Sequence, residues 1–141
     1  MNIRRMQQAY GSSALENEVG GASPHKLVLM LFDGALQAIR LAKLQMAQGK
    51  VAEKGKLIGK AVSIIDEGLR NSLDAEQGGE LAVNLASLYE YCTRRLLEAN
   101  LHNDEAALDE VDALLGEVRS AWAEIGYKPA PAAVEPAHAL R

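Results

Sequence analysis

An apolar side chain recurs every three or four positions over residues 104–125, the clearest pattern in this sequence. The members of the stripe are Leu108, Val111, Leu115, Val118, Trp122 and Ile125. This spacing places them on one face of an α-helix and is typical of a helix-packing seam. Asp104 and Glu105 suit the positive end of such a helix, and Gly126 supplies a stop. The segment predicts an amphipathic helix that packs against other helices.

Three earlier segments repeat this kind of element. The first begins at Ser23–Pro24, where serine suits the N-cap and proline the first helical position, and it ends before Gly49. The second spans roughly residues 51–73. The third spans roughly residues 80–100, and its expected inward stripe is made of Leu81, Leu85, Leu88, Tyr89, Cys92, Leu96 and Ala99. Short connections join the first to the second and the third to the fourth, so each pair is expected to be antiparallel. The prediction is an all-α fold, an antiparallel four-helix bundle over residues 23–126.

Both ends of the chain are predicted to lie outside this bundle. Residues 1–22 form an N-terminal arm with Ile3, Met6 and Tyr10 at spacings of three and four. That stripe is too short to hold a helix without a surface to lie on. Residues 127–141 are rich in proline and alanine and have no hydrophobic period, so a disordered C-terminal tail is expected.

Composition excludes several classes of protein. Cys92 is the single cysteine, so the chain has no internal disulfide and no zinc motif. The longest apolar run, Leu27–Phe32, is far shorter than the ~20 residues that span a bilayer. Basic residues gather in 24–73 and acidic residues in 104–126, without a recognisable nucleic-acid-binding motif. We expect a cytoplasmic protein that neither inserts into membranes nor binds nucleic acid.

The sequence offers little for catalysis. A di-iron site in a helical bundle needs Glu-x-x-His on two helices, and the predicted helices contain none. Neither a glycine-rich phosphate loop nor a nucleophile elbow is present. Cys92 falls on the inward stripe of the third helix, and His25 lies in the first turn of the first helix, not mid-helix as a phosphoryl acceptor would. The prediction is a non-enzymatic protein without metal or cofactor.

More apolar surface is present than a four-helix core requires. The first helix has a second stripe, made of Leu29, Phe32 and Leu36. The third helix has an additional row beside its core stripe, made of Asn84, Leu88, Tyr91 and Arg95. Either neighbouring elements cover these residues, or they form a groove for an incoming amphipathic helix whose register the amide of Asn84 fixes. The residues alone leave both interpretations open.

Several stretches of the chain are similar to a known family. They are Tyr10 in the arm, SPHKLVLMLFDGAL at 23–36, NSLDAEQGGELAVNLASLYEY at 71–91, LLEAN at 96–100, and EVDALL with AW at 110–115 and 121–122. In order and spacing, from the arm through the fourth helix, they resemble the flagellar secretion chaperone FliS family. Two positions depart from it: Phe32 stands where the family often has tyrosine, and Cys92 where methionine is usual.

The resemblance implies an export chaperone that binds the disordered C-terminal segment of flagellin in the cytoplasm. It would prevent premature polymerisation and support secretion through the flagellar export apparatus, as a monomer or weak homodimer. The family's N-terminal arm lies over an apolar pocket that the client also uses. The expected partner-binding residues are Ile3, Met6, Tyr10, Met30, Phe32, Leu73, Asn84, Leu88 and Tyr91. The alternative is a helical adaptor or signalling bundle that dimerises through the fourth helix.

Overall fold

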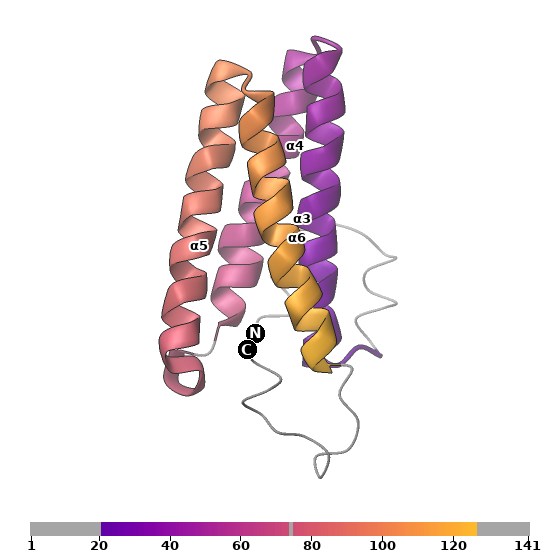
Figure 1. The fold of residues 1–141 in the computed structure, drawn as a ribbon. Helices are drawn as coiled ribbons and strands as arrows, with labels where there is room; N and C mark the ends of the chain where they lie inside the picture. The colour runs from indigo at the N-terminus through magenta and orange to yellow at the C-terminus, as the bar shows by residue number, and fades with distance from the viewer. Residues whose placement is uncertain (1–20, 74, 127–141) are drawn as a thin grey trace.

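A computed structural model describes residues 21–73 and 75–126, with the side chains of 75–77 excluded. The elements are α3 (Pro24–Ala47), α4 (Val51–Ser63), the π-helix η1 (Ile64–Leu69), the 3₁₀ turn η2 (Arg70–Ser72), α5 (Ala75–His102) and α6 (Glu105–Gly126). Because α4, η1 and η2 continue one another, the described residues form four rods and contain no strand (Figure 1). The predicted all-α four-helix bundle is confirmed for this part of the chain. The predicted arm and tail lie outside the described residues.

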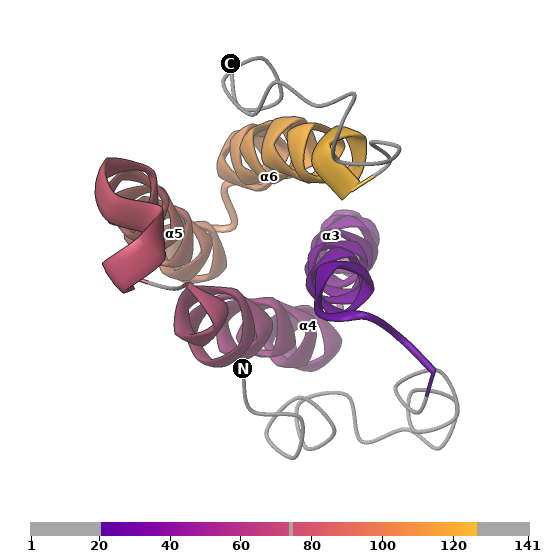
Figure 2. The same ribbon diagram turned by 90° about the horizontal axis from the view of Figure 1, so that it is seen from below.

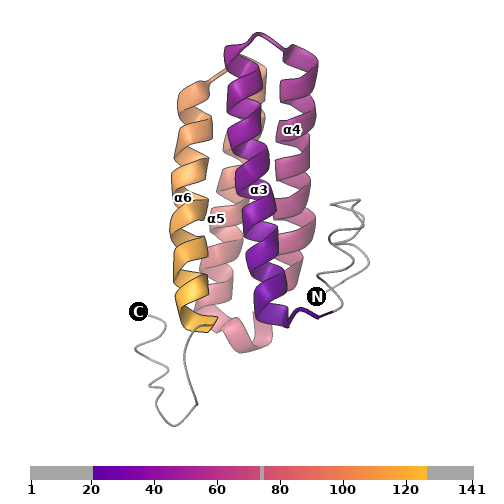
Figure 3. The same ribbon diagram turned by 90° about the vertical axis from the view of Figure 1, so that its right-hand side faces the viewer.

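The rods run up and down in turn. The lower end of the bundle in Figure 1 holds the start of α3, the end of α6 and the connection into α5. The upper end holds the two short loops, residues 48–50 and 103–104. Seen from below, the rods occupy four corners, with α3 and α5 on opposite corners (Figure 2). The two neighbours α3 and α4 lie side by side along their length (Figure 3).

The ends of α3 follow from its sequence. The Ser23 hydroxyl accepts a hydrogen bond from the Lys26 N–H at 3.1 Å, and Pro24 opens the helix. At the other end Gly49 has a φ of 73°, a conformation that glycine adopts without strain. Both predicted boundaries of the first helix are confirmed.

Burial of α3 on two sides organises the core. Leu31 is fully buried and its neighbour Phe32 is 1% exposed, although adjacent helical residues point about 100° apart. One neighbour therefore cannot cover both, and α3 packs against the α4 rod on one side and α6 on the other. The predicted second stripe of this helix is therefore largely covered within the chain, because Leu36 is buried and Leu29 half-buried as well.

The α4 rod changes its winding in its lower half. The predicted helix over 51–73 is correct in extent, but residues Ile64–Leu69 form a π-helix and Arg70–Ser72 a 3₁₀ turn. Within the π-helix, Ile64, Ile65, Gly68 and Leu69 are buried. A Cβ added to Gly68 would lie 2.8 Å from Leu31 Cδ2, so glycine permits the rod to approach α3 closely here. Gly59 has open space instead.

A buried lysine ties the upper end of the bundle together. Lys54 of α4 is 3% exposed. Its Nζ donates to the Asn100 carbonyl oxygen at 2.9 Å and to Asn103 Oδ1 at 2.6 Å. Because a buried ammonium without acceptors is strongly destabilising, this cation holds α4 to the end of α5.

Ion pairs join α3 to α6 along their exposed edge. The pairs are Arg40–Asp112 at 3.1 Å, Lys43–Asp109 at 2.8 Å and Arg119–Asp33 at 2.9 Å. Two of the three place the cation on α3 and the carboxylate on α6, in line with the opposite charges of these segments. Exposed pairs of this kind contribute about 0–1 kcal/mol each, so they select the pairing of helices more than they stabilise it.

The close approach at Gly68 yields a stability prediction. Gly68→Ala should lower the free energy of unfolding by about 1–3 kcal/mol, because the methyl group overlaps a Leu31 side chain that is itself fully buried. Gly59→Ala, in the same rod, should raise it by up to about 1 kcal/mol through helix propensity. Urea unfolding followed by circular dichroism measures both. Equal effects of the two substitutions would contradict the close-packing argument.

Candidate functional site

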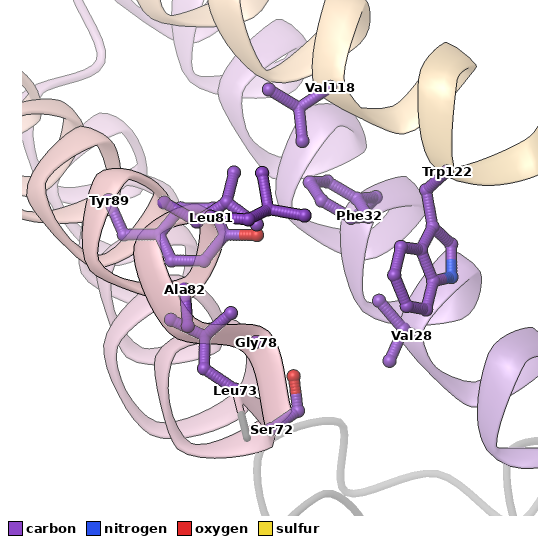
Figure 4. Close-up of a pocket in the computed structure, with 11 residues that line it drawn as sticks. Val28, Phe32, Ser72, Leu73, Gly78, Leu81, Ala82, Tyr89, Val118 and Trp122 are labelled. Atoms are coloured by element: carbon purple, nitrogen blue, oxygen red, sulfur yellow. The ribbon is translucent and has the colours of Figure 1, made fainter. Parts of the chain in front are cut away.

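A pocket of about 210 Å³ lies in the lower half of the bundle, between α3, α5 and α6. Figure 4 shows side chains from these helices and from the connection before α5 pointing into it. The lining residues are Val28, Phe32, Ser72, Leu73, Gly78, Leu81, Ala82, Leu85, Tyr89, Val118 and Trp122. This volume is below the roughly 300–1,000 Å³ of sites for drug-sized molecules and cofactors. It suits a few side chains of a partner.

The pocket exists because α5 and α6 diverge. They meet at the upper end of the bundle and lie apart at the lower end (Figures 1 and 2). Leu81 was predicted to face inward, but it is 48% exposed, so this part of the prediction is wrong. Helical periodicity places Leu81 on the inward face of this helix. At the lower end of the bundle, however, α6 lies too far away to cover the side chain. Its exposed side chain forms part of the pocket wall.

The first turns of α5 shape the pocket mouth. Gly79 has φ 52° and ψ −127°, outside helical values, and breaks the helix between the segment that starts at Ala75 and the main rod. Only glycine adopts such a backbone readily. The predicted start near Glu80 therefore matches the start of the straight part of α5. The break sets Gly78 and Leu81 against the pocket.

The described pocket wall carries no charged side chain. The Ser72 hydroxyl already donates to the Leu69 carbonyl oxygen at 2.8 Å. The indole N–H of Trp122 already donates to the His25 carbonyl oxygen at 3.0 Å. A charged group would lose its hydration there without gaining a counter-charge. The pocket therefore favours apolar side chains.

A histidine supports the Trp122 side of the pocket from behind. The rings of His25 and Trp122 stack with centroids 4.8 Å apart and an interplanar angle of 13°. His25 Nε2 is buried and has no hydrogen-bond partner among the described residues. Burial lowers the pKa of His25 below 6.5, so the neutral ring is the form that packs here.

The structure separates the predicted partner-binding residues into groups. Phe32 and Leu73 line the pocket. Met30 is half-buried and packs against the core on α3, but it does not belong to the pocket wall. The arm residues Ile3, Met6 and Tyr10 lie outside the described residues.

The remaining predicted residues form a row that leads upward from the pocket on α5. Asn84 is exposed and Leu88 half-buried, three and seven residues after Leu81. At the top of the row the Tyr91 hydroxyl donates to Glu110 of α6, and Arg95 donates to the same carboxylate at 2.8 Å. These bonds, Tyr91 first, lower the pKa of Glu110. The row therefore ends where α5 is tied to α6.

The fourth-helix seam lies inside the bundle. Leu108, Val111 and Leu115 are fully buried, and Val118 and Trp122 pack against the same core. Leu108, Val111 and Leu115 are therefore not available for the dimerisation that the alternative prediction requires.

Sequence periodicity missed much of the pocket wall. It placed Leu85, Tyr89, Val118 and Trp122 on core stripes, and it did not single out Val28, Ser72 or Ala82. Helical periodicity identifies the inward face of a helix, but it gives no information on whether a neighbouring helix reaches that face. The sequence contains no signal that separates a packed stripe from an open one.

The described residues supply no evident catalytic group. Cys92 is fully buried, and burial raises the pKa of its thiol to about 11, so it is not a reactive thiolate at neutral pH.

Across residues 21–73 and 75–126 no group of three or more His, Cys, Asp or Glu side chains is placed so that it could hold a metal ion. In the same ranges every helix is too short or too polar to traverse a bilayer.

Comparison with known proteins agrees with the sequence resemblance. Residues 6–129 match the family described as "Flagellar protein FliS". The chain is 50% identical over 121 residues to the flagellar secretion chaperone FliS of Salmonella typhimurium, covering 86% of this chain and 90% of that protein. It is 46% identical over 127 residues to the flagellar secretion chaperone FliSB of Pseudomonas aeruginosa, covering 90% and 100%. The Escherichia coli flagellar secretion chaperone FliS is 47% identical over 122 residues, covering 86% and 90%.

The buried histidine behind the pocket predicts a dependence of stability on pH. Since the folded-state pKa of His25 lies below the unfolded value of 6.5, the unfolded chain binds the proton more readily. The stability that depends on a neutral His25 is fully present above pH 6.5. It is lost as the pH falls through 6.5 towards the folded-state pKa. His25→Phe keeps an aromatic ring against Trp122 and cannot titrate. Between about pH 7.5 and about pH 5.5 the wild type should therefore lose more unfolding free energy than this variant.

Urea titrations at the two pH values, read by the fluorescence of the single tryptophan, measure this difference. An equal loss in both proteins would mean that His25 takes up its proton as easily in the folded state as in the unfolded state.

Proposed function

This chain belongs to the FliS family of flagellar proteins, and on that basis we propose that it is a cytosolic export chaperone for flagellin. It binds the disordered C-terminal segment of flagellin, prevents premature polymerisation and supports secretion by the flagellar type III export apparatus. The observation that carries the proposal is the apolar pocket at the lower end of the bundle, with half-exposed Leu81 in its wall. Such a surface is what an amphipathic helix needs in order to dock.

The mechanism requires occupancy and no chemistry. A flagellin segment that coils against other subunits presents an apolar stripe, which is an aggregation hazard while the segment is free. If its largest apolar side chains enter the pocket, that stripe is covered. The segment becomes helical only as it binds, so part of the interaction energy is spent on ordering it, which keeps affinity moderate and favours release.

The surface extends beyond the pocket along α5. Asn84 and Leu88 continue the wall upward from Leu81, and Asn84 is exposed, so a partner's backbone or amide groups can reach it. The tie between Tyr91 and Glu110 marks where α5 and α6 close again. We assign Phe32, Leu73, Asn84 and Leu88 to the client surface. Tyr91 would lie at the upper edge of this surface.

The N-terminal arm would act as an internal competitor. The helix α3 begins at the lower end of the bundle, the same end as the pocket, so a segment as long as residues 1–20 is long enough to reach the pocket (Figure 1). Ile3, Met6 and Tyr10 carry the apolar groups for this contact. Occupancy by the arm reduces apparent affinity for the client in proportion to the time that the pocket is covered.

The pocket assignment is tested by a matched pair of charge substitutions on one helix. Leu81→Glu puts a carboxylate in the apolar wall and should weaken binding of a peptide from the C-terminal segment of flagellin at least about tenfold. Leu101→Glu makes the same change at the upper end of α5, at a side chain that is 75% exposed and outside the pocket, and should leave binding unchanged. Isothermal titration calorimetry measures both. Equal affinities would show that the client binds elsewhere.

The competitor role of the arm is tested by Tyr10→Ala in the full-length chain. If the arm covers the pocket, removing its aromatic group should tighten peptide binding severalfold, because less of the protein is in the closed form. The same titration gives the affinity, and Trp122 fluorescence reports the environment of the pocket wall in the absence of peptide. Weaker binding would instead make Tyr10 a direct contact of the client.

A further inference from the structure

Tyr89 places a hydroxyl group in the largely apolar pocket. The residue is 3% exposed and lines the pocket from α5. Its ring is tilted at 60° to that of Phe32, with centroids 6.4 Å apart. Figure 4 shows its oxygen pointing away from the α5 backbone, across the pocket towards Phe32.

No described residue hydrogen-bonds with this hydroxyl. The other polar groups of the pocket differ, because the Ser72 hydroxyl and the Trp122 N–H are already engaged with backbone carbonyls. Burial raises the pKa of Tyr89, so the phenol stays neutral and retains both a donor and an acceptor.

Among the described residues, the Tyr89 hydroxyl is not one of the fully enclosed side-chain atoms that lack a partner, so it faces the open space of the pocket. A bound segment that fills the pocket would enclose it. A tyrosine hydroxyl buried without a hydrogen-bond partner is destabilising, so the bound segment must supply a partner or lose affinity. Phenylalanine would fill the same space against Phe32 and make no such demand.

We propose that the Tyr89 hydroxyl is a specificity-determining contact that hydrogen-bonds with an uncharged polar side chain on the bound segment. This inference rests on the proposed function, because it concerns what the client presents to the pocket. A helical client has its backbone carbonyls engaged internally, so the partner group must come from a side chain. A charged group is disfavoured because the described wall offers no counter-charge.

This proposal defines which side chains the bound segment must carry. The segment that enters the pocket carries Ser, Thr, Asn or Gln on its apolar face, next to the large apolar side chains that fill the remaining volume. A hydrogen bond at one fixed point sets which turn of the client helix occupies the pocket. An apolar helix of the same size without that group would fit the walls but leave the hydroxyl unpaired.

The test compares two hydroxyl groups on the same helix. Tyr89→Phe removes the pocket hydroxyl, and Thr93→Val removes a hydroxyl that donates to the Glu90 carbonyl oxygen outside the pocket. With a C-terminal flagellin peptide in isothermal titration calorimetry, Tyr89→Phe should bind about five- to tenfold more weakly than wild type, the size of one hydrogen bond. Thr93→Val should bind within about twofold of wild type. Thermal unfolding should show Tyr89→Phe at least as stable as wild type.

A double-mutant cycle then identifies the group on the peptide. Each polar residue of the peptide's apolar face is replaced by a side chain of similar size without its polar group: Ser→Ala, Thr→Val, Asn→Leu or Gln→Met. One replacement should weaken binding to wild type by about the same five- to tenfold and have no further effect on Tyr89→Phe. A merely structural tyrosine would not show this coupling.

Different failures have different meanings. If wild type binds the peptide and Tyr89→Phe binds it equally well, the inference is wrong and the proposed function stands. A loss of stability in Tyr89→Phe, or weaker binding that couples to no peptide residue, would make the hydroxyl structural and also overturn the inference. If wild type binds no C-terminal flagellin peptide, the proposed function fails, and this inference fails with it.

Discussion

The structure depends on the need to cover two adjacent side chains of α3 from different sides. Leu31 and Phe32 are both buried, yet successive helical residues point about 100° apart. Leu31 is met by the α4 rod, where Gly68 allows the backbone to come close. Phe32 faces Tyr89 of α5 and the pocket beside α6. Because one side of α3 is closed by backbone approach and the other by larger, more widely spaced side chains, the bundle is tight on one side and hollow on the other.

Hydrogen bonds between the helices explain why the pocket lies at the lower end of the bundle. In the upper half, Lys54 holds α4 to the end of α5, and Glu110 of α6 receives hydrogen bonds from Tyr91 and Arg95 of α5. The described contacts include no such tie between α5 and α6 below Leu88, and there the two helices diverge (Figure 1). The stacked pair of His25 and Trp122 keeps the α6 side of the gap fixed to α3. These contacts bound the pocket above and on its α6 side, and it lies where α5 and α6 diverge (Figure 1).

The sequence predicts the fold well and the site only in part, because the two depend on interactions of different range. Helix boundaries depend on local chemistry, so Ser23–Pro24 and Gly49 could be placed from the residues alone. Periodicity likewise identified Leu108, Val111 and Leu115 as core. Whether Leu81 is covered depends instead on the distance between α5 and α6, which many contacts far apart in the sequence determine together. The π-helical winding of Ile64–Leu69 is similarly invisible, because its apolar pattern also fits an ordinary helix. Phe32 and Leu73 were predicted through family resemblance, whereas Tyr89 was taken for a core residue.

The pocket's small size and its chemistry suit a client that must be released. A volume of about 210 Å³ accommodates only a few side chains, so the contact made inside the pocket is small beside a large obligate interface. Apolar walls alone would accept any amphipathic helix of the right width, and a chaperone with that property would be occupied by the wrong partners. On our proposal the Tyr89 hydroxyl (Figure 4) changes the balance, because a helix without a matching group would bury it unsatisfied, whereas the correct helix would pair it. Discrimination is then obtained by penalising wrong clients and not by tightening the right one. In a protein whose proposed task is to hold a segment and then surrender it, selectivity that does not require high affinity is the useful kind.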